Sequence, residues 1–327
     1  MASDVITPLV FNPIFKTVIW GGEKIAAFKG IDTDLTGIGE CWEISGIAEN
    51  PSVVARGPLA GMTLPEVLAR YGEELVGKSV YRRYGNTFPL LIKIIDTAAD
   101  LSLQVHPDDE LAARRHNSLG KTEMWYVVDA EPGAVIHSGF SREITPQEYE
   151  ERAANNTLMD VVTTHKSHPG DVFFLPAGRI HSAGAGNLLI EIHETSDITY
   201  RIYDFGRVDA RTGRPRELHV EEAKEAIDYK VRQSGATRPG PETDGKSALT
   251  SCSHFTADLL RVGGEREVST DYDSFTTLTC IEGSIQVRTG AGEETALTLR
   301  RGQSALIPAP VNRLTLTGTA TLIAAHC

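Results

Sequence analysis

Two side chains that can bind a metal ion, Gln104 and His106, stand two residues apart in the sequence. They lie in LSLQVHPDDELA (residues 101–112), where apolar and polar residues alternate until Pro107 interrupts the pattern. This alternation is typical of a half-buried β-strand, and it places both polar side chains on one face of the strand. The pattern therefore predicts that an amide oxygen and an imidazole nitrogen are presented to the same point.

Two further residues could complete a metal site with this pair. His181 follows LPAGRI, in which Pro and Gly favour a tight turn that directs the imidazole back over a sheet, and Glu123 begins the apolar segment EMWYVV. Two imidazoles, one carboxylate and one amide oxygen suit Zn²⁺ with a position left open for water or substrate, as in catalytic zinc sites. Because no sequence rule determines which strands meet, this four-residue set is a hypothesis.

The remaining histidines are interpreted as ordinary surface or core residues. The chain has ten histidines, and an isolated one is more often solvated or satisfied in the core than a metal ligand. Most of the others stand in polar or terminal segments, and no partner for His137 or His193 is visible in the sequence.

Many short strands and a few short helices are expected to position these residues. Strand-like segments separated by Gly, Pro and Asn turns make up much of the chain. Thr63 and Glu66 form the pattern of a capping box, and Pro146 stands at a favoured first helical position. We therefore predict helices over residues 63–71, 145–154 and 221–229, and another one directly after Pro107.

Two related domains joined by a linker are expected. The segment VRQSGATRPGPETDGKS (231–247) is polar and rich in Gly and Pro, and nearly all of the sequence after it is strand-like. GDVFFLPAGRIH (170–181) and GQSALIPAPVNR (302–313) resemble each other, with Arg313 in the position of His181. This repeat predicts a metal-binding catalytic domain over residues 1–230, a linker over 231–247, and a related domain without the metal ligands over 248–327.

Composition and charge exclude several classes of protein. With 327 residues, 41% hydrophobic and 23% charged, the sequence is that of an ordinary globular protein with room for two domains. It has no run of about 18 apolar residues, so we expect no membrane span, and its start lacks the features of a secretory signal. The net charge of −12 argues against a nucleic-acid partner. Four scattered cysteines favour a reduced, cytoplasmic protein.

Four motifs taken together resemble type I mannose-6-phosphate isomerase. They are QVHPDD, GKTEMWYVV, LPAGRIHSAG and IEIHETSDITYRIYDFGR, in the family's order. Counted from Lys93 in PLLIKIIDTA they span residues 93–207, and VIWGGEKI and GIGECWEIS before them are also family-like. Asp109 and Thr122 stand where long members of the family have Lys and Pro, which indicates the short bacterial branch. The resemblance implies a mostly β fold of two cupin-type jelly-roll β-barrel domains with a few short helices.

The resemblance also implies a role for individual residues. The metal ligands would be Gln104, His106, Glu123 and His181, holding one Zn²⁺ per chain. The catalytic residues would be Arg201, Lys121 and Glu191, and the substrate would be bound by Lys93, Ser102 and Arg201.

The implied reaction is the interconversion of mannose 6-phosphate and fructose 6-phosphate through an enediol. Zn²⁺ would polarise the reacting oxygens, while Arg201, Lys121 and Lys93 would supply cations for the phosphate or the enediolate. The proton carrier stays open among Glu191, Asp197, Lys121 and a metal-bound water. The expected partner is a small sugar phosphate, with the chain a monomer or a weak homodimer.

Two other functions are alternatives. The first is a cupin metalloenzyme with another sugar, another sugar phosphate or another chemistry, such as a dioxygenase; Gln104 as a ligand disfavours the last, because such sites usually gather more histidines around iron. The second is a sugar-phosphate sensor without catalysis, which the presence of all four candidate ligands and of Arg201 disfavours.

Overall fold

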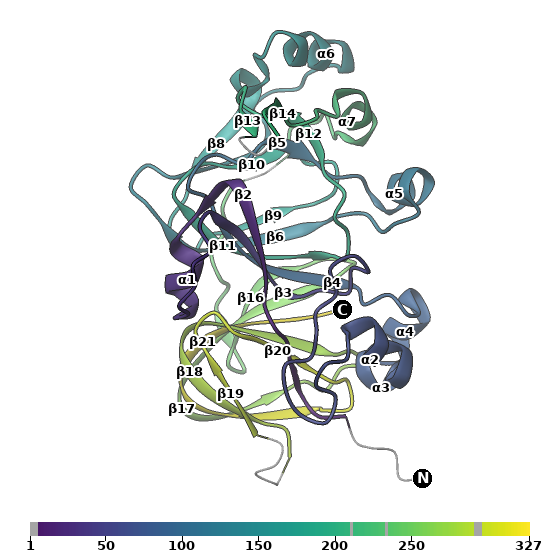
Figure 1. Cartoon of the computed structure of the whole chain (residues 1–327), viewed down its shortest axis with the longest axis vertical. Helices are drawn as coiled ribbons and strands as arrows, with labels where there is room; N and C mark the ends of the chain where they lie inside the picture. The colour runs from purple at the N-terminus through teal and green to yellow at the C-terminus, as the bar shows by residue number, and fades with distance from the viewer. Residues whose placement is uncertain (1–5, 210–211, 233–234, 291–295) are drawn as a thin grey trace.

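The computed structural model of the chain describes residues 6–209, 212–232, 235–290 and 296–327. Strands are the main regular structure of the described part, with two large sheets in the upper half of Figure 1 and a third, curved sheet below them. A small separate sheet pairs β13 (Val208–Asp209) with β14 (Arg214–Pro215). All of its α-helices are short, and all but α1 lie on the right-hand side of this view or at its top. The expectation of a mostly β chain with a few short helices is therefore confirmed.

A six-stranded antiparallel sheet lies between the other two sheets. Its strands, in spatial order, are β2 (Ile14–Gly22), β3 (Ile38–Ile44), β4 (Leu90–Asp96), β11 (Asn187–Glu194), β6 (Glu123–Ala130) and β9 (Val172–Leu175). The central strands β4 and β11 are buried at every residue, because both faces of this sheet are covered. Charged residues on these strands must therefore find partners inside the protein.

A five-stranded sheet packs against one face of the six-stranded sheet. Its strands, in spatial order, are β12 (Tyr200–Tyr203), β5 (Leu103–Val105), β10 (His181–Ala183), β7 (Val135–Phe140) and β8 (Val162–Lys166). One apolar cluster joins Trp125 and Phe173 of the first sheet to Ile136 and Ala183 of the second. The two sheets thus form a sandwich, with inward side chains of both sheets between them.

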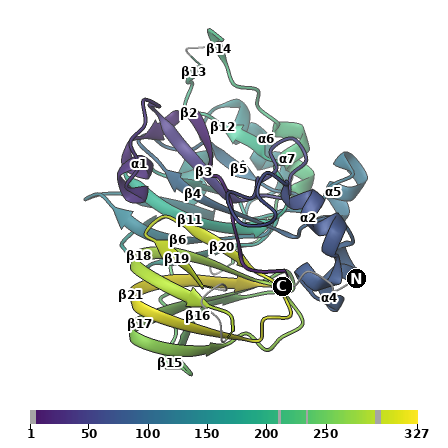
Figure 2. The ribbon, with the colours of Figure 1, turned by 60° about the horizontal axis from the view of Figure 1, so that its bottom comes forward.

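An eight-stranded sheet forms most of the C-terminal part. Its path is β1 (Leu9–Val10), β20 (Ser304–Ile307), β18 (Thr276–Arg288), β21 (Arg313–His326), β17 (Thr256–Ser269), β16 (Lys246–Ser251) and β15 (Glu242–Thr243), with β19 (Ala296–Arg300) beside β18. The sheet bends around its own apolar cluster, which includes Leu260, Leu278 and Leu314 (Figure 2). Its path has free ends at β1 and β15, so the described sheets are not closed into hydrogen-bonded barrels.

The internal repeat corresponds to equivalent pieces of structure. In the first copy, β9 leads into a turn and β10 begins at His181; in the second, β20 leads into a turn and β21 begins at Arg313. His181 is buried, whereas Arg313 is exposed and pairs with Glu267 at 3.4 Å. The second copy therefore carries a surface ion pair at the position of the first copy's buried imidazole.

Two capping patterns and the break at Pro107 correctly predict where three helices begin. Helix α2 (Leu64–Tyr71) follows Thr63, which forms the complete capping box with Glu66. Helix α6 (Pro146–Ala154) follows Thr145, and α5 (Asp109–His116) follows the N-cap Asp108. The other helical segments are α1 (Lys24–Lys29), α3 (Glu73–Val76), α4 (Lys78–Tyr84), α7 (Val220–Ala226) and the 3₁₀ turn Leu158–Val161. Among the described helices, none has the length and apolar character needed to cross a membrane.

The prediction of a helix to residue 229 is wrong, because α7 ends at Ala226. The N–H of Asp228 donates to the carbonyl of Gly178 at 2.9 Å, which takes the chain away from the helical path. Tyr229 then packs against Phe140 and Tyr149.

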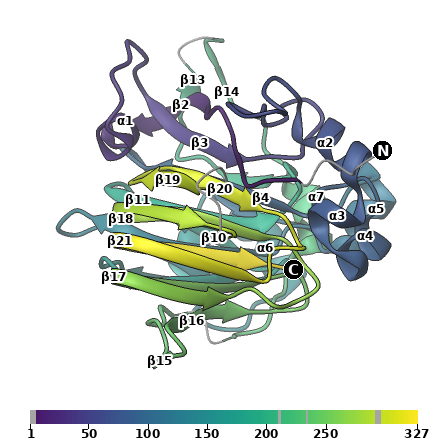
Figure 3. The ribbon, with the colours of Figure 1, turned by 90° about the horizontal axis from the view of Figure 1, so that it is seen from below.

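The division into residues 1–230 and 248–327 stays a prediction, and several contacts cross it. Strand β1 pairs with β20 of the C-terminal sheet, and β15 and the start of β16 lie within the segment 231–247 expected to be a linker. Thr237, also in that segment, pairs with Val172 at the edge of the six-stranded sheet. Helices α2, α3 and α4 lie beside one end of the C-terminal sheet (Figure 3), where Phe88 contacts Phe275 with ring centroids 4.7 Å apart.

Candidate metal centre and active site

Two adjacent strands of the five-stranded sheet bring Gln104 and His181 together. His181 on β10 lies directly opposite Gln104 on β5, and the side-chain nitrogens Gln104 Nε2 and His181 Nε2 are 3.3 Å apart. His106 follows the end of β5, and its ring centroid lies 4.9 Å from that of His181. The two segments that carry these residues are more than 70 positions apart in the chain, so only the pairing of the strands makes them neighbours.

The carboxylate comes from the facing sheet. Glu123, the first residue of β6, places Oε1 at 2.9 Å from His181 Nε2 and Oε2 at 3.5 Å from His106 Nε2. The ligand-type atoms of His106, Glu123 and His181 all lie within 4.8 Å of one another. Glu123 is fully buried and both imidazoles are 1% exposed, so the cluster is shielded from solvent.

Backbone carbonyls orient both imidazoles toward this cluster. His106 Nδ1 lies 2.9 Å from the Ile198 carbonyl oxygen, and His181 Nδ1 lies 2.8 Å from that of Arg179. Since a carbonyl only accepts hydrogen bonds, each Nδ1 carries the proton and each Nε2 of the neutral ring offers a lone pair. Two electron-pair donors, His181 Nε2 and Glu123 Oε1, then face each other at 2.9 Å, and His106 Nε2 is buried without a hydrogen-bond partner. A proton on His181 or a metal ion would satisfy this contact, and the convergence of His106 Nε2 on the same point fits a metal ion.

Two buried lysines and a second carboxylate adjoin the cluster. Lys121 Nζ lies 2.9 Å from Glu123 Oε2 and 3.6 Å from Glu191 Oε1, and Lys93 Nζ lies 3.5 Å from Glu191 Oε1. Cross-strand register explains this, because Glu191 on β11 stands directly opposite Lys93 on β4. All four side chains are at most 4% exposed.

Electrostatics keeps the lysines and carboxylates charged and His106 neutral. Burial by itself would raise the pKa of Glu123, but Lys121 outweighs it, so this pKa lies below its ordinary value. The pKa of Glu191 is also lowered, since Lys121 and Lys93 outweigh burial. Burial would lower the pKa of Lys121, but Glu123 and Glu191 raise it above its ordinary value. Burial, with the charge of Lys121, lowers the pKa of His106.

Sequence reasoning missed His193 and the aromatic partners of the site. His193 Nε2 lies 3.1 Å from Glu191 Oε1, and Trp125 Nε1 donates to Glu191 Oε2 at 2.7 Å. On the neighbouring strand, Trp42 lies beneath the Lys93 ammonium, 4.8 Å from Nζ to the ring centroid. The two-residue period of IEIHE could have placed His193 on the same face as Glu191, but the contacts of both tryptophans depend on strand register.

Arg201 and Ser102 lie beside the cluster rather than within it. Arg201 on β12 stands opposite Gln104, on the same face of the sheet, and its Nη1 donates to the Glu217 carbonyl at 2.8 Å. Burial lowers the pKa of Arg201, and its Nε is buried without a hydrogen-bond partner. Ser102 is buried, and the two-residue alternation along this segment puts it on the face of Gln104.

A second polar cluster joins the site's sheet to the C-terminal part. His254 Nδ1 lies 2.6 Å from Glu194 Oε1 and 4.0 Å from Asp109 Oδ2. The other oxygen of Glu194 accepts the N–H of Thr122 at 2.9 Å, next to Glu123 in the chain. The hydrogen bond that His254 donates to the Glu194 carboxylate raises the pKa of His254 against the effect of burial. We interpret this cluster as an ion pair across the two parts of the chain.

Comparison with known proteins agrees with this geometry. A family model described as "Phosphomannose isomerase type I, catalytic domain" matches residues 9–136, and one described as "Mannose-6-phosphate isomerase, cupin domain" matches residues 245–327. A mannose-6-phosphate isomerase of Bacillus subtilis is 34% identical over 322 residues, covering 98% of each chain. The chain belongs to the type I mannose-6-phosphate isomerase family. It is similar over 98% of its length to the crystal structure of mannose 6-phosphate isomerase from Bacillus subtilis, with a TM-score of 0.88 and 32% identity.

Other relatives extend the likeness. A mannose-6-phosphate isomerase of Streptococcus mutans is 31% identical over 321 residues, covering 98% of each chain. Phosphomannose isomerase from Salmonella typhimurium has a TM-score of 0.81 over 98% of this chain at 16% identity, which shows a shared fold. The type I mannose-6-phosphate isomerase family is thus matched at both ends of the chain and over its full length, which makes this chain an enzyme of that family.

Proposed function

We propose that this enzyme interconverts mannose 6-phosphate and fructose 6-phosphate with one bound metal ion per chain, Zn²⁺. The observation that carries the proposal is the meeting of Gln104, His106, Glu123 and His181 from three separate chain segments, with His181 Nε2 and Glu123 Oε1 2.9 Å apart. The proposed substrate and the class of reaction, isomerisation of mannose 6-phosphate, are those in the name of the Bacillus subtilis relative.

The residues of the cluster fit a zinc ion. Two neutral imidazoles with free Nε2 lone pairs, one carboxylate and one side-chain amide form the donor set, and hydrogen bonds from Nδ1 hold both rings in place. Rotation of the Gln104 amide exchanges its nitrogen and oxygen and would present Oε1 to the cluster. When bound, a zinc ion would act as a Lewis acid on the sugar's carbonyl and hydroxyl oxygens.

The chain's own residues would bind the sugar phosphate and stabilise negative charge. Isomerisation moves a proton from C2 to C1 through an enediol, so a negative charge develops on the oxygens of these carbons. Lys121 is a fixed, buried cation beside Glu123 and would stabilise that charge. Arg201, opposite Gln104 with an unpartnered Nε, would bind the substrate as a planar fork. Ser102 lies on the same face of that sheet, and Lys93 comes from the facing sheet.

Glu191 fits a positioning role better than that of a proton carrier. Its carboxylate receives the Trp125 N–H and lies near Lys93, Lys121 and His193, which holds its pKa below the ordinary value. A carboxylate stabilised in its charged form is a weak base. Glu191 would therefore hold the two lysines in place and maintain their charge.

A nearby cleft offers a route for the substrate. It has a volume of about 840 Å³ and is lined by Thr195, Ser196, Asp197 and Ile198, the last of which orients His106 through its carbonyl. Asp197 is exposed in this cleft and makes no ion pair with a described residue, so it is our preferred carboxylate for proton transfer.

A cytoplasmic location and a monomer or weak homodimer stay predictions.

The proposal is tested by an isomerase assay with mannose 6-phosphate before and after removal of metal by a chelator. We expect turnover in the native enzyme, loss of turnover after chelation, recovery on adding Zn²⁺, and about one zinc per chain by elemental analysis. Full activity in chelated, metal-free enzyme would refute the metal's role, and metal-loaded enzyme inactive toward mannose 6-phosphate would refute the proposed substrate.

A further inference from the structure

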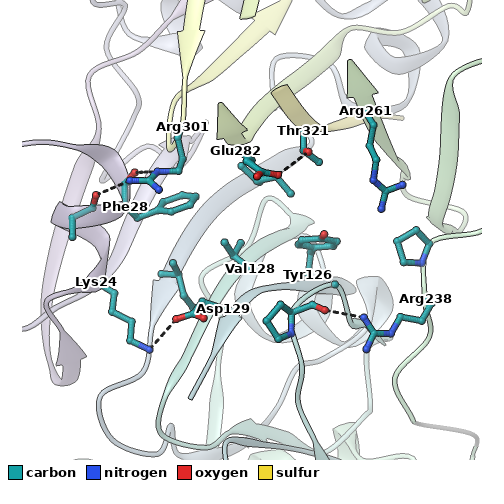
Figure 4. A pocket seen from close by; sticks show the side chains of 16 residues that line it. Lys24, Phe28, Tyr126, Val128, Asp129, Arg238, Arg261, Glu282, Arg301 and Thr321 are labelled. Atoms are coloured by element: carbon teal, nitrogen blue, oxygen red, sulfur yellow. Dashed lines mark hydrogen bonds and ion pairs between the residues drawn. The ribbon is translucent and has the colours of Figure 1, made fainter. Parts of the chain in front are cut away.

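A second cleft lies between the six-stranded sheet and the C-terminal sheet, on the opposite side of β6 from the metal centre. Its volume is about 850 Å³. Along β6, Glu123 and Trp125 point toward the metal centre, so the two-residue alternation directs Tyr126 and Val128 to the other face, where they line this cleft (Figure 4). A molecule in the cleft would thus lie on the other side of the strand that carries Glu123.

Cationic side chains outnumber anionic ones in this cleft, although the whole chain has a net charge of −12. The lining includes Lys24, Arg238, Arg261 and Arg301 against the two carboxylates of Asp129 and Glu282. Lys24 already lies 3.5 Å from Asp129, and Arg301 donates to the carbonyls of Phe28 and Ala27. Two of the four cations are therefore occupied by neighbours at one end of the cleft.

The other end contains Arg238 and Arg261 beside the ring of Tyr126 (Figure 4). Arg261 makes no ion pair with any described carboxylate, although it faces the cleft. Arg238 is held by the Pro169 carbonyl at 2.8 Å and by Asp171 at 3.0 Å. These contacts use Nη1 and Nη2, so Nε and the second N–H of each terminal nitrogen could donate to a ligand.

Two backbone features next to Arg238 determine where its side chain lies. Gly170 has a φ of +87°, which favours glycine, and a Cβ at this position would lie 2.9 Å from Arg238 Nη1, so a larger residue would displace the guanidinium. Thr237, directly before Arg238, exchanges two backbone hydrogen bonds with Val172 of β9, at 2.9 and 3.0 Å. The position of Arg238 is thus set by a glycine and a strand pairing.

The phenol of Tyr126 completes the polar end. Burial raises the pKa of Tyr126, and the charges of Arg261 and Arg238 oppose this rise only in part. The phenol is therefore neutral at physiological pH and can donate a hydrogen bond. Beyond it, Val128, Leu188 and Ile281 form an apolar floor.

We propose that this cleft binds a small phosphate monoester with an apolar body, held by Arg238, Arg261 and Tyr126. Two guanidinium groups and a hydroxyl supply enough donors for the three terminal oxygens of a phosphate, and guanidinium matches phosphate in geometry and charge. The apolar floor would take the organic part of the ligand. A ligand here does not compete with the sugar phosphate, because the sheet separates the two sites.

Calorimetry with phenyl phosphate as the probe tests the proposal on the full-length, zinc-loaded enzyme, with the metal site kept saturated by an isomerase substrate. Because one charge-assisted contact is removed, we expect Arg261→Ala and Arg238→Ala each to weaken binding by about tenfold or more. The matched control is Arg313→Ala, which replaces an exposed arginine of the C-terminal sheet that also carries Arg261. This variant should bind phenyl phosphate as tightly as the wild type does. Turnover of the sugar phosphate should be unchanged in Arg261→Ala.

Two further measurements decide the location and the chemical class. Crystals of the full chain soaked in sodium tungstate, a phosphate analogue, should show anomalous density between Arg238 and Arg261 that Arg261→Ala removes. Density at the metal centre alone, or phenyl phosphate binding unaffected by Arg261→Ala, would overturn the site. Benzoate should bind more weakly than phenyl phosphate; equal binding would overturn the assignment to phosphate.

Discussion

The substitution Glu123→Gln tests the metal centre most directly, because it removes the cluster's anionic ligand and keeps its size. Glu123 is fully buried, with Lys121 Nζ at 2.9 Å and both imidazoles within 3.5 Å. We expect zinc content to fall from about one per chain toward zero and isomerase turnover to be lost with it, since neutral donors alone hold a dication poorly. The apolar core between the two sheets is untouched, so the fold should persist.

The cost to stability follows from the contacts of Lys121. At an effective dielectric constant of about 20, its attraction to Glu123 at 2.9 Å is about 6 kcal/mol and that to Glu191 at 3.6 Å about 5 kcal/mol. The substitution thus removes about half of the attraction. Breaking a buried pair costs roughly 3–5 kcal/mol, and with Glu191 retained we expect about 3 kcal/mol. For a chain of 327 residues, with an unfolding entropy of about 2.1 cal/mol/K per residue, that lowers the Tm of the metal-free enzyme by about 4 °C.

Glu43→Gln is the matched control. Glu43 is also buried and lies 2.5 Å from Lys29, but it belongs to the opposite face of β3 from Trp42 and has no part in the metal centre. Its substitution should lower the Tm similarly, as measured by calorimetry, while zinc content and turnover stay normal. If Glu123→Gln keeps one zinc per chain and normal turnover, the ligand assignment is wrong. If its metal-free Tm is unchanged while that of Glu43→Gln falls, the ion-pair reasoning is wrong.

Three further predictions concern other parts of the enzyme. Arg201→Ala should lower kcat without loss of zinc, and Arg201→Lys should also be poor, because an ammonium cannot reproduce the planar fork; near-normal kcat for the lysine variant would contradict this role. Mannose 6-phosphate should have a far higher kcat/KM than mannose, with inorganic phosphate as a competitor, since the phosphate orients C1 and C2; comparable values would disprove phosphate recognition. The pKa of His254 is raised by Glu194, so the stabilisation from this pair is complete below about pH 6.5 and is lost as the pH rises through the raised pKa. The Tm difference between the wild type and His254→Gln should therefore be larger at about pH 6 than at about pH 9, and a difference independent of pH would refute the ion pair.

Local patterns in the sequence determined several features of this protein. The alternation around Gln104 and His106 predicts a strand with a polar face, and Thr63 and Thr145 mark helix starts that the structure places at the next residue. These features depend on neighbours within a few positions, such as the capping hydrogen bond that a threonine oxygen accepts from the N–H three residues later. The internal repeat is likewise visible in the sequence, which shows that Arg313 stands where the first copy has His181.

Tertiary structure alone decided which of these elements meet. His181 Nε2 and Glu123 Oε1 lie 2.9 Å apart because the two sheets that carry them face each other. His193 joins the site because the register of β11 against β6 places it opposite Glu123. Strand register is set by the collective burial of apolar faces from segments far apart in sequence, so no local pattern contains it. The same holds for the cleft beside Tyr126, which exists only where the six-stranded sheet packs against the C-terminal one. It holds equally for the end of α7, where the carbonyl of a distant turn takes the N–H that would have continued the helix.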